Sequence, residues 1–426
     1  MTAVRRLMRT LFVTRRSQTA VAALLVVAVA GGASTGFWLL FRLAYVIAIG
    51  VPVAWLWARL NAGGLSVRVE RFADRVHEGQ AVEGRITIEN RSWFAKLWLE
   101  VEDRSDLPGY GARRVISLAR GGRKTWLVSG PAQRRGVFAV GPVRVTASDP
   151  FGLFKKTVNF GARHAVLVFP RAVELAGFDV PLAHLPGEGR FRRPTQTLTP
   201  NAAGVRPYVP GDAFNRIHWP STARTGQLMV KLFELDPASD VWLVLDLYRA
   251  VHAGEGEHGT EEYAVRVTAS VARHFLVANR TVGLLAYGRQ YHVEEPDRGI
   301  QQYSRILEDL ALARAAGDVP LEDLLANEAR RFGRHTTVVV ITPATDDGWV
   351  ASLNQAAGRG ARTAAVLLEA ETFGAAGTSL LAYSALAASG VPVFTLQRDA
   401  DLREALGLAD GPGGSGAAAP LAGGSR

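Results

Sequence analysis

The chain has 426 residues, of which 48% are hydrophobic and 21% charged, and it carries a formal net charge of +10. This length allows two or three domains, and this balance excludes an intrinsically disordered chain. Cysteine is absent, which excludes disulfides and cysteine-based zinc sites. The arginines are spread along the chain without a long run, so we expect an anionic membrane face or an acidic partner and no nucleic acid.

The first 62 residues predict a membrane anchor. Residues 1–18 are basic and contain no acid, and two apolar stretches follow, Thr19–Gly36 and Phe37–Leu60. A membrane-spanning helix needs roughly 20 predominantly apolar residues, so the two stretches are just long enough to predict two membrane-spanning helices joined by a short turn. The predicted joint is the small-residue run at 31–34, and the aromatic residues suited to the membrane interface are Trp38, Trp55 and Trp57.

The charges beside these stretches predict their orientation. Basic residues flank both outer ends, at Arg15, Arg16, Arg59, Arg68 and Arg71. By the positive-inside rule both ends face the cytoplasm, which predicts a multi-pass protein of the cytoplasmic membrane whose soluble domains are cytoplasmic. The rival interpretation is a secretory signal peptide, and the absence of a clear cleavage site followed by polar sequence argues against it.

Residues 63–170 predict an all-β sandwich of the immunoglobulin-like kind. Short alternating strands recur between Gly, Pro and Asp turn residues, which is typical of a sandwich. The expected strands are Leu65–Phe72, Val82–Ile88, Lys96–Val101, Lys124–Val128, Val137–Ala147 and Ala165–Phe169.

Residues 171–239 predict an irregular connector, and residues 240–410 a doubly wound α/β domain. The expected strands are Val241–Leu247, Val282–Tyr287, Tyr291–Glu294, Thr337–Thr342, Thr363–Leu368 and Val393–Leu396. The expected helices are Glu261–Ala278, Ile300–Ala315, Leu321–Phe332, Trp349–Ala357, Leu380–Ala388 and Leu402–Leu406. The Gly- and Ala-rich tail at 411–426 is expected to be disordered.

One dense stretch, Val205–Leu235, carries the most distinctive residues of the connector. After a Pro-Gly turn, Asp212 is expected to cap a short helical turn that Pro220 ends, Ser221 or Thr222 to cap a second turn, and Leu228–Phe233 to form a strand. The candidate partner-binding or interdomain residues are Arg206, Tyr208, Pro210, Gly211, Asp212, Arg216, Ile217, His218, Trp219, Arg224 and Lys231. The acid and the three arginines among them predict an ion-pair network, which ties domains together or docks a partner.

This stretch resembles the signature of domain-of-unknown-function family fifty-eight: R-x-Y-x-P-G-D, then R-x-I-x-W, then A-R-T and a strand ending near F-E. Two positions depart from it, since Ala213 replaces a common second acid and Pro220 a common basic residue. The resemblance implies that the α/β domain is von Willebrand factor A-like and that the partner is a MoxR-type AAA+ ATPase acting in protein assembly or maturation.

The von Willebrand factor A fold often holds magnesium, and the resemblance implies where its ligands would lie. Asp246 stands at the end of the first strand of that domain, but Tyr248 and Ala250 replace the expected serines. Because a hard cation needs several oxygen ligands, we expect no magnesium and no other cofactor. Asp346 and Asp347 are nearby and are possible substitute ligands.

The sequence therefore predicts a membrane-anchored cytoplasmic scaffold or adaptor rather than an enzyme. No P-loop, H-E-x-x-H zinc motif or G-x-S-x-G elbow occurs in the chain. Two other classes stay open, a hydrolase that uses Asp212 and His218 and a basic nucleic-acid-binding protein.

Overall fold

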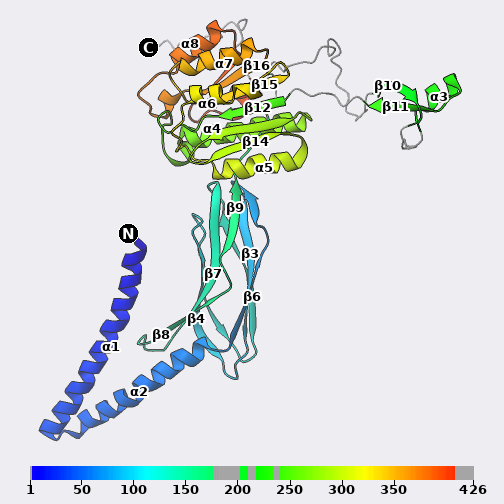
Figure 1. The fold of residues 1–426 in the computed structure, drawn as a ribbon. Coiled ribbons are helices and arrows are strands. Elements are labelled where there is room, and N and C mark those ends of the chain that lie inside the picture. The colour runs from blue at the N-terminus through cyan, green and yellow to red at the C-terminus, as the bar shows by residue number, and fades with distance from the viewer. Residues whose placement is uncertain are drawn as a thin grey trace, which may run out of the picture. The chain divides into compact units, whose positions relative to one another are not determined.

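The computed structural model describes residues 2–175, 178, 180, 202–209, 217–233 and 240–407 (Figure 1). Side chains are described from residue 17 onward, except those of residues 112, 202–206, 231–233 and 407. The predicted tail and much of the connector lie outside these residues. The chain divides into two compact units, of which the first comprises Met1–Arg171 with Leu310–Leu312 and the second the remainder.

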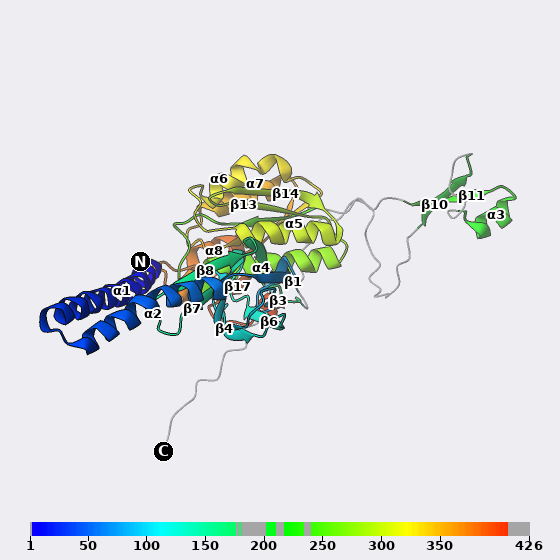
Figure 2. The same ribbon diagram turned by 90° about the horizontal axis from the view of Figure 1, so that it is seen from below.

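Two long helices open the first unit, α1 (Thr2–Thr35) and α2 (Trp38–Ala62); they contact each other near the turn that joins them and diverge away from it (Figures 1 and 2). Ser17–Thr35 has a mean hydropathy of 1.6 and Trp38–Ala62 one of 2.0, and most of both segments is exposed. Exposed apolar helices of this length and composition are long enough to cross a membrane.

The turn between the two helices lies at Gly36-Phe37, so the predicted joint at 31–34 is wrong. Gly36 has a φ of +70° and its N–H donates to the carbonyl of Gly32, a left-handed helix end that glycine adopts without strain. Gly31 and Gly32 instead continue α1, where an added Cβ would lie 3.2 Å from the side chains of Leu40 and Phe41. Their small size therefore lets α2 approach closely.

The rest of the first unit consists of two sheets with a shared core. The strands are β1 (Leu65–Arg71), β2 (Arg75–His77), β3 (Ala81–Asn90), β4 (Lys96–Ser105), β5 (Ala112–Leu118), β6 (Arg123–Pro131), β7 (Gly136–Ser148), β8 (Lys155–Phe160) and β9 (His164–Phe169). One sheet has the order β1-β3-β6, and the other β2-β9-β7-β4-β5 with β8 on β7. We call this the two-sheet domain.

All six strands expected in this region are present, and three more were missed. The missed strands are β2, which is short, and β5 and β8, which alternate less clearly. Ile86 and Ile88 of one sheet pack with Leu99, Val101 and Val145 of the other, so the inward residues of both sheets form one core.

The second unit contains a six-stranded sheet with helices. Its strands are β12 (Asp240–Leu245), β13 (Val282–Tyr287), β14 (Tyr291–Asp297), β15 (Thr336–Thr342), β16 (Arg362–Leu368) and β17 (Val393–Leu396). Its helices are α4 (Thr260–Val277), α5 (Gly299–Leu312), α6 (Leu321–Asn327), α7 (Gly348–Gly358), α8 (Leu380–Ala388) and α9 (Leu402–Gly407), with short 3-10 turns at Gly256–His258, Ala329–Arg331 and Ala370–Phe373. We call this the α/β domain.

The sheet order is β14-β13-β12-β15-β16-β17, with all strands parallel except the edge strand β14. Residues Trp242 and Val244 pack with α6, α7 and α8, while the alternate residues Val241 and Leu243 are fully buried and α4 also contacts β12. The chain moves from β12 to β13 on one side and returns to β15 on the other. The carboxyl ends of β12 and β15 therefore form a topological switch point, where ligand sites of such sheets lie.

The expected helix over Leu321–Phe332 is interrupted, whereas the other expected helices differ from the observed ones by only a few residues at their ends. The interrupted helix breaks after Asn327 into α6 and the 3-10 turn Ala329–Arg331. Glu328, at the break, accepts hydrogen bonds from the Tyr287 hydroxyl and from Arg331. These side-chain bonds hold the chain at this break.

Candidate functional site

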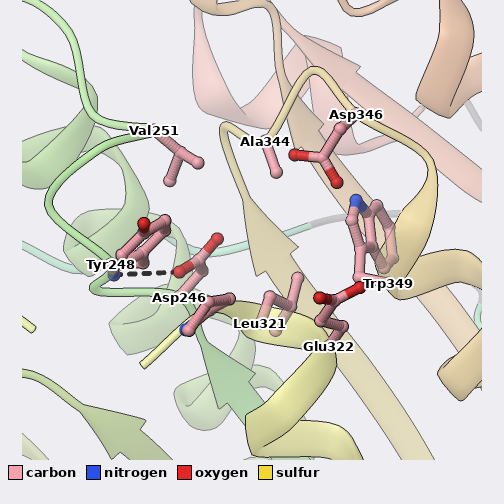
Figure 3. A pocket seen from close by; sticks show the side chains of 9 residues that line it. Asp246, Tyr248, Val251, Leu321, Glu322, Ala344, Asp346 and Trp349 are labelled. Atoms are coloured by element: carbon pink, nitrogen blue, oxygen red, sulfur yellow. Dashed lines mark hydrogen bonds between the residues drawn. The ribbon is translucent and has the colours of Figure 1, made fainter. Parts of the chain in front are cut away.

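A cavity of about 230 Å³ lies at the switch point (Figure 3). Its lining residues are Asp246, Tyr248, Val251, Pro320, Leu321, Glu322, Ala344, Asp346 and Trp349. They come from the segment after β12, the start of α6, the loop after β15 and the first turn of α7. We call this the switch-point pocket.

Asp246 lies at the base of the pocket and is 2% exposed. Its Oδ2 accepts a hydrogen bond from the Thr342 hydroxyl at 2.6 Å, and its Oδ1 accepts one from the Tyr248 N–H at 3.0 Å. The Nε2–H of His252 donates to the Asp246 carbonyl at 3.0 Å, while Nδ1 faces the Thr260 hydroxyl at 3.0 Å. The predicted position of Asp246 at the strand end is therefore confirmed, and its side chain is held by the end of the neighbouring strand β15 and by the backbone directly after β12.

Burial raises the pKa of Asp246 above its usual range, and the nearby Asp346 adds to the rise. The hydrogen bonds from Thr342 and Tyr248 act in the opposite direction and do not overcome the loss of hydration. The pocket thus favours the neutral acid at its base.

Two further carboxylates and an indole complete the pocket (Figure 3). The carboxylates of Glu322 and Asp346 both lie next to Gly348. A Cβ added at Gly348 would be 2.8 Å from the Glu322 carboxylate and 3.6 Å from that of Asp346. Trp349 is 1% exposed, and its Nε1–H has no acceptor among the described residues. The nine lining residues include three acids and no base, so the pocket is acidic.

Two features of the pocket count against a divalent cation of the kind that the resemblance implies. Each oxygen of Asp246 accepts a hydrogen bond, and burial raises the pKa of Asp246, which disfavours the carboxylate form that a cation would need. Within the described residues no group of three His, Cys, Asp or Glu side chains has a metal-binding arrangement. Asp346 lines the pocket, whereas Asp347 is not among the lining residues and precedes α7.

We expect magnesium neither to bind measurably nor to raise the melting temperature, because a ligand stabilises only the state that it binds. Isothermal titration of the detergent-solubilised chain with magnesium chloride checks this. A saturable heat signal that disappears in Asp246→Ala would contradict it and would identify Asp346 as a ligand for further substitution.

The described part of the connector forms a small module of two strands and a helix: β10 (Ala202–Pro207), β11 (Met229–Phe233) and α3 (Trp219–Thr225). Arg206 lies in β10 opposite Val230, and Lys231 lies in β11 opposite Val205. Four candidate residues, Pro210, Gly211, Asp212 and Arg216, lie outside the described residues, as does most of the predicted first helical turn. The ion-pair network predicted for them stays a prediction.

Three candidates fix the fold of this module. Tyr208 donates its N–H to Leu228, and Ile217, 4% exposed, forms a bridge with Val230. The N–H of His218 donates to Met229 and its Nδ1 lies 2.7 Å from the Ser221 hydroxyl. This His–Ser contact joins residues three apart at the start of one helix, which is typical of a local helix-end bond.

The other two candidates point to solvent. Trp219 is 66% exposed and Arg224 is exposed. The expectation that Pro220 ends a helical turn is wrong, since it lies in the first turn of α3. Proline is tolerated there because the first N–H groups of a helix have no partner within the helix.

Sequence reasoning missed Glu322 and Trp349. Both are near the starts of helices that follow loops, and Glu322 had a weak signal in the acidic first turn after Val319-Pro320. Their meeting at Asp246 depends on the order of strands in the sheet, which the pattern of residues does not specify.

Comparisons with known proteins agree with the resemblance in the second unit. Residues 204–372 match the family described as "Protein of unknown function DUF58". The chain is 25% identical over 288 residues to the "Uncharacterized protein YeaD" of Bacillus subtilis (strain 168), covering 65% of this chain and 70% of that protein.

Similar solved structures include the conserved hypothetical protein BatB from Bacteroides thetaiotaomicron, with a TM-score of 0.30, 14% identity, and coverage of 40% of this chain and 96% of that one. The C-terminal domain of wzt has a TM-score of 0.21 and 12% identity, and covers 26% of this chain and 75% of that one. The family match spans the described connector module and the α/β domain through β16, so residues 204–372 of this chain are similar to DUF58, a family of unknown function.

Proposed function

We propose that the protein is a membrane-anchored adaptor that holds a partner protein on the cytoplasmic side of the cell membrane. The observation that carries the proposal is the pair of exposed apolar helices joined to two folded units. Val46 of α2 is 68% exposed, and such a surface is unfavourable in water along two whole helices. A bilayer removes that cost.

Both helix ends that carry basic residues belong on the cytoplasmic side in this proposal. A periplasmic reporter fused after Asn61 in a chain truncated there should be inactive, and the same reporter after Phe37 should be active. Activity at both positions, or only after Asn61, would contradict the hairpin orientation.

We also propose a fold family for each of the two folded domains. An Asp at the end of the first strand, a pocket at the switch point and one antiparallel edge strand support a von Willebrand factor A-like α/β domain. Two packed antiparallel-rich sheets support an immunoglobulin-like two-sheet domain. Both are non-catalytic scaffolds in this role.

The partner surface that we propose is the exposed part of the β10–β11–α3 module. Tyr208 and His218 donate their N–H groups to Leu228 and Met229, which brings Val209 and Trp219 beside the same backbone pair. Val209 is 55% exposed and Trp219 66%. Exposed Trp and Arg residues are enriched among those that dominate protein–protein binding energy, and α3 exposes both Trp219 and Arg224.

The proposed partner is a MoxR-type AAA+ ATPase, as the resemblance implies. Affinity purification of the full chain from membranes of its host should recover this ATPase, and Trp219→Ala should lose most of it. Truncating an interface Trp typically costs about 2 kcal/mol or more, which is roughly a 30-fold weakening.

Tyr291→Ala is the matched control, because Tyr291 is an aromatic residue of similar exposure (69%) on β14 of the α/β domain. Both variants must keep the melting temperature of the wild type for the comparison to count. Undiminished recovery of the ATPase by Trp219→Ala and by Arg224→Ala would exclude this module as the docking surface.

A further inference from the structure

One end of the two-sheet domain is fastened to the last turn of α2. Only Gly63 and Gly64 separate α2 from β1. The Asn61 side chain donates to the Leu97 carbonyl at 2.7 Å and accepts from the Leu97 N–H at 3.1 Å. The Lys96 ammonium donates to the Leu60 carbonyl, where the helix dipole favours a cation. The start of β4 therefore moves with the end of the helix.

The loop before β4 is held at the same place. The Arg91 N–H donates to the Gly64 carbonyl at 2.8 Å, and a Cβ added at Gly64 would lie 3.0 Å from Ser92. The Asn90 amide, in a residue that is 1% exposed, donates to the carbonyls of Phe94 and Ala119. Residues 91–98 and the turn at 119–122 thus form one rigid end of the domain.

This rigid end exposes two tryptophans. Trp93 is 75% exposed and Trp98 61%. Trp98 has a φ of +50° within a register irregularity between Lys96 and Leu99. Bulky residues rarely adopt this conformation, and such irregularities redirect side chains. The chain accepts backbone strain at a position where a large apolar ring faces outward.

The same end of the domain also carries basic side chains. Arg91, Arg120, Arg123 and Lys124 are exposed at this end. The acid that two of them approach is Glu89, at 3.8 Å from Arg91 and 3.6 Å from Arg123. One carboxylate cannot neutralise four cations, so the end carries a net positive charge. We call Arg91, Trp93, Trp98, Arg120, Arg123 and Lys124 the Trp93–Trp98 face.

A third exposed aromatic residue lies in a loop beside the other helix, α1. Phe151 is 75% exposed in the β7–β8 loop, which the buried Asp149 orders by accepting the N–H groups of Phe151 and Phe154. The carbonyl of Leu153 in this loop accepts a hydrogen bond of 2.9 Å from Gln18, at the start of the apolar segment of α1. Both helices therefore meet an exposed aromatic loop at the same end of the apolar pair.

We propose that the Trp93–Trp98 face lies in the headgroup layer of an anionic bilayer, with both indoles inserted among the lipids. This inference rests on the proposed anchoring of α1 and α2. The 25 residues of α2 extend about 37 Å against a hydrocarbon thickness of about 30 Å, so its last turn emerges among the headgroups. Indoles prefer that layer, and cations are attracted to anionic lipid there. Trp55 and Trp57 of α2 continue the same aromatic belt.

The absence of cysteine makes site-specific labelling direct. Single cysteines replace Trp93, Trp98, Val46 or Val137 in the full chain, and each carries a nitroxide in nanodiscs of phosphatidylcholine and phosphatidylglycerol. The depth of each nitroxide in the bilayer is measured from its collision rates with two reagents: oxygen, which concentrates in lipid, and a nickel chelate, which stays in water. Val137 is the matched control, since it is an exposed apolar residue (54%) at the opposite end of β7 from the Phe151 loop.

We expect the Val46 label to be in hydrocarbon, the Trp93 and Trp98 labels at interfacial depth with several-fold fewer nickel collisions than Val137, and the Val137 label in water. A Val46 label in hydrocarbon with Trp93 and Trp98 labels as hydrated as Val137 would overturn the inference and leave the anchor intact. A hydrated Val46 label would overturn the anchor itself and this inference with it.

Discussion

Replacing Asp103 by alanine is expected to lower the free energy of unfolding of the two-sheet domain by about 3–5 kcal/mol. The Asp103 side chain is fully buried, and its two oxygens accept hydrogen bonds of 2.7 Å from both terminal nitrogens of Arg71. The Tyr110 hydroxyl donates to the same carboxylate. The substitution leaves the Arg71 cation, whose side chain is 9% exposed, without its counter-charge.

Glu102→Ala is the matched control. Glu102 is the next residue in β4 and pairs with Arg113 at 3.3 Å, but its side chain is 31% exposed and that of Arg113 is 64% exposed. A solvated pair contributes at most about 1 kcal/mol. Thermal unfolding of the full chain in detergent, followed for both variants, measures the difference. Equal small losses would mean that Asp103 is hydrated in the folded protein.

Replacing Asp246 by asparagine is expected to make the α/β domain more stable than the wild type at pH 8 and about equally stable near pH 4. The asparagine amide resembles the neutral acid that the pocket favours, with its oxygen facing the Tyr248 N–H and its nitrogen facing the Thr342 hydroxyl. The variant has no charge to bury.

The sign follows from the raised pKa of Asp246, whose main cause is burial. Between the unfolded and the folded pKa, the folded protein holds a proton that the unfolded chain has lost, so wild-type stability falls as pH rises through this window. Each unit of the pKa difference corresponds to about 1.4 kcal/mol. Above the folded pKa the loss is complete and constant.

Chemical denaturation from pH 4 to pH 8 checks this, with Asp347→Asn as the control. Asp347 is exposed and precedes α7, where Asn serves as well as Asp at a helix N-terminus. The difference between wild type and Asp246→Asn should grow with pH, while Asp347→Asn should follow the wild type. Parallel curves for wild type and Asp246→Asn would show that Asp246 is ionised when folded.

Strand β8 and the true position of the helix turn were missed because the local residue pattern does not show them. Residues 81–90 alternate cleanly because one face is buried, and β3 was expected, whereas β8 carries three polar residues at its start and has a weak pattern. The small-residue run Gly31–Ser34 was predicted to be the joint between the two helices. In the structure, the small Gly31 and Gly32 instead allow close contact with Leu40 and Phe41 of α2, and this contact is visible only when the two helices are packed together.

The sequence by itself determined the two apolar helices, the succession of strands and helices along the α/β domain, and the position of Asp246 at the end of β12. These depend on local periodicity and on burial, which each segment carries in its own side chains. Only the tertiary structure decided that Glu322, Asp346 and Trp349 meet Asp246, and that Asn61 and Lys96 fasten α2 to β4. Such meetings depend on which strands become neighbours, and that choice minimises the free energy of the whole fold rather than of any one segment.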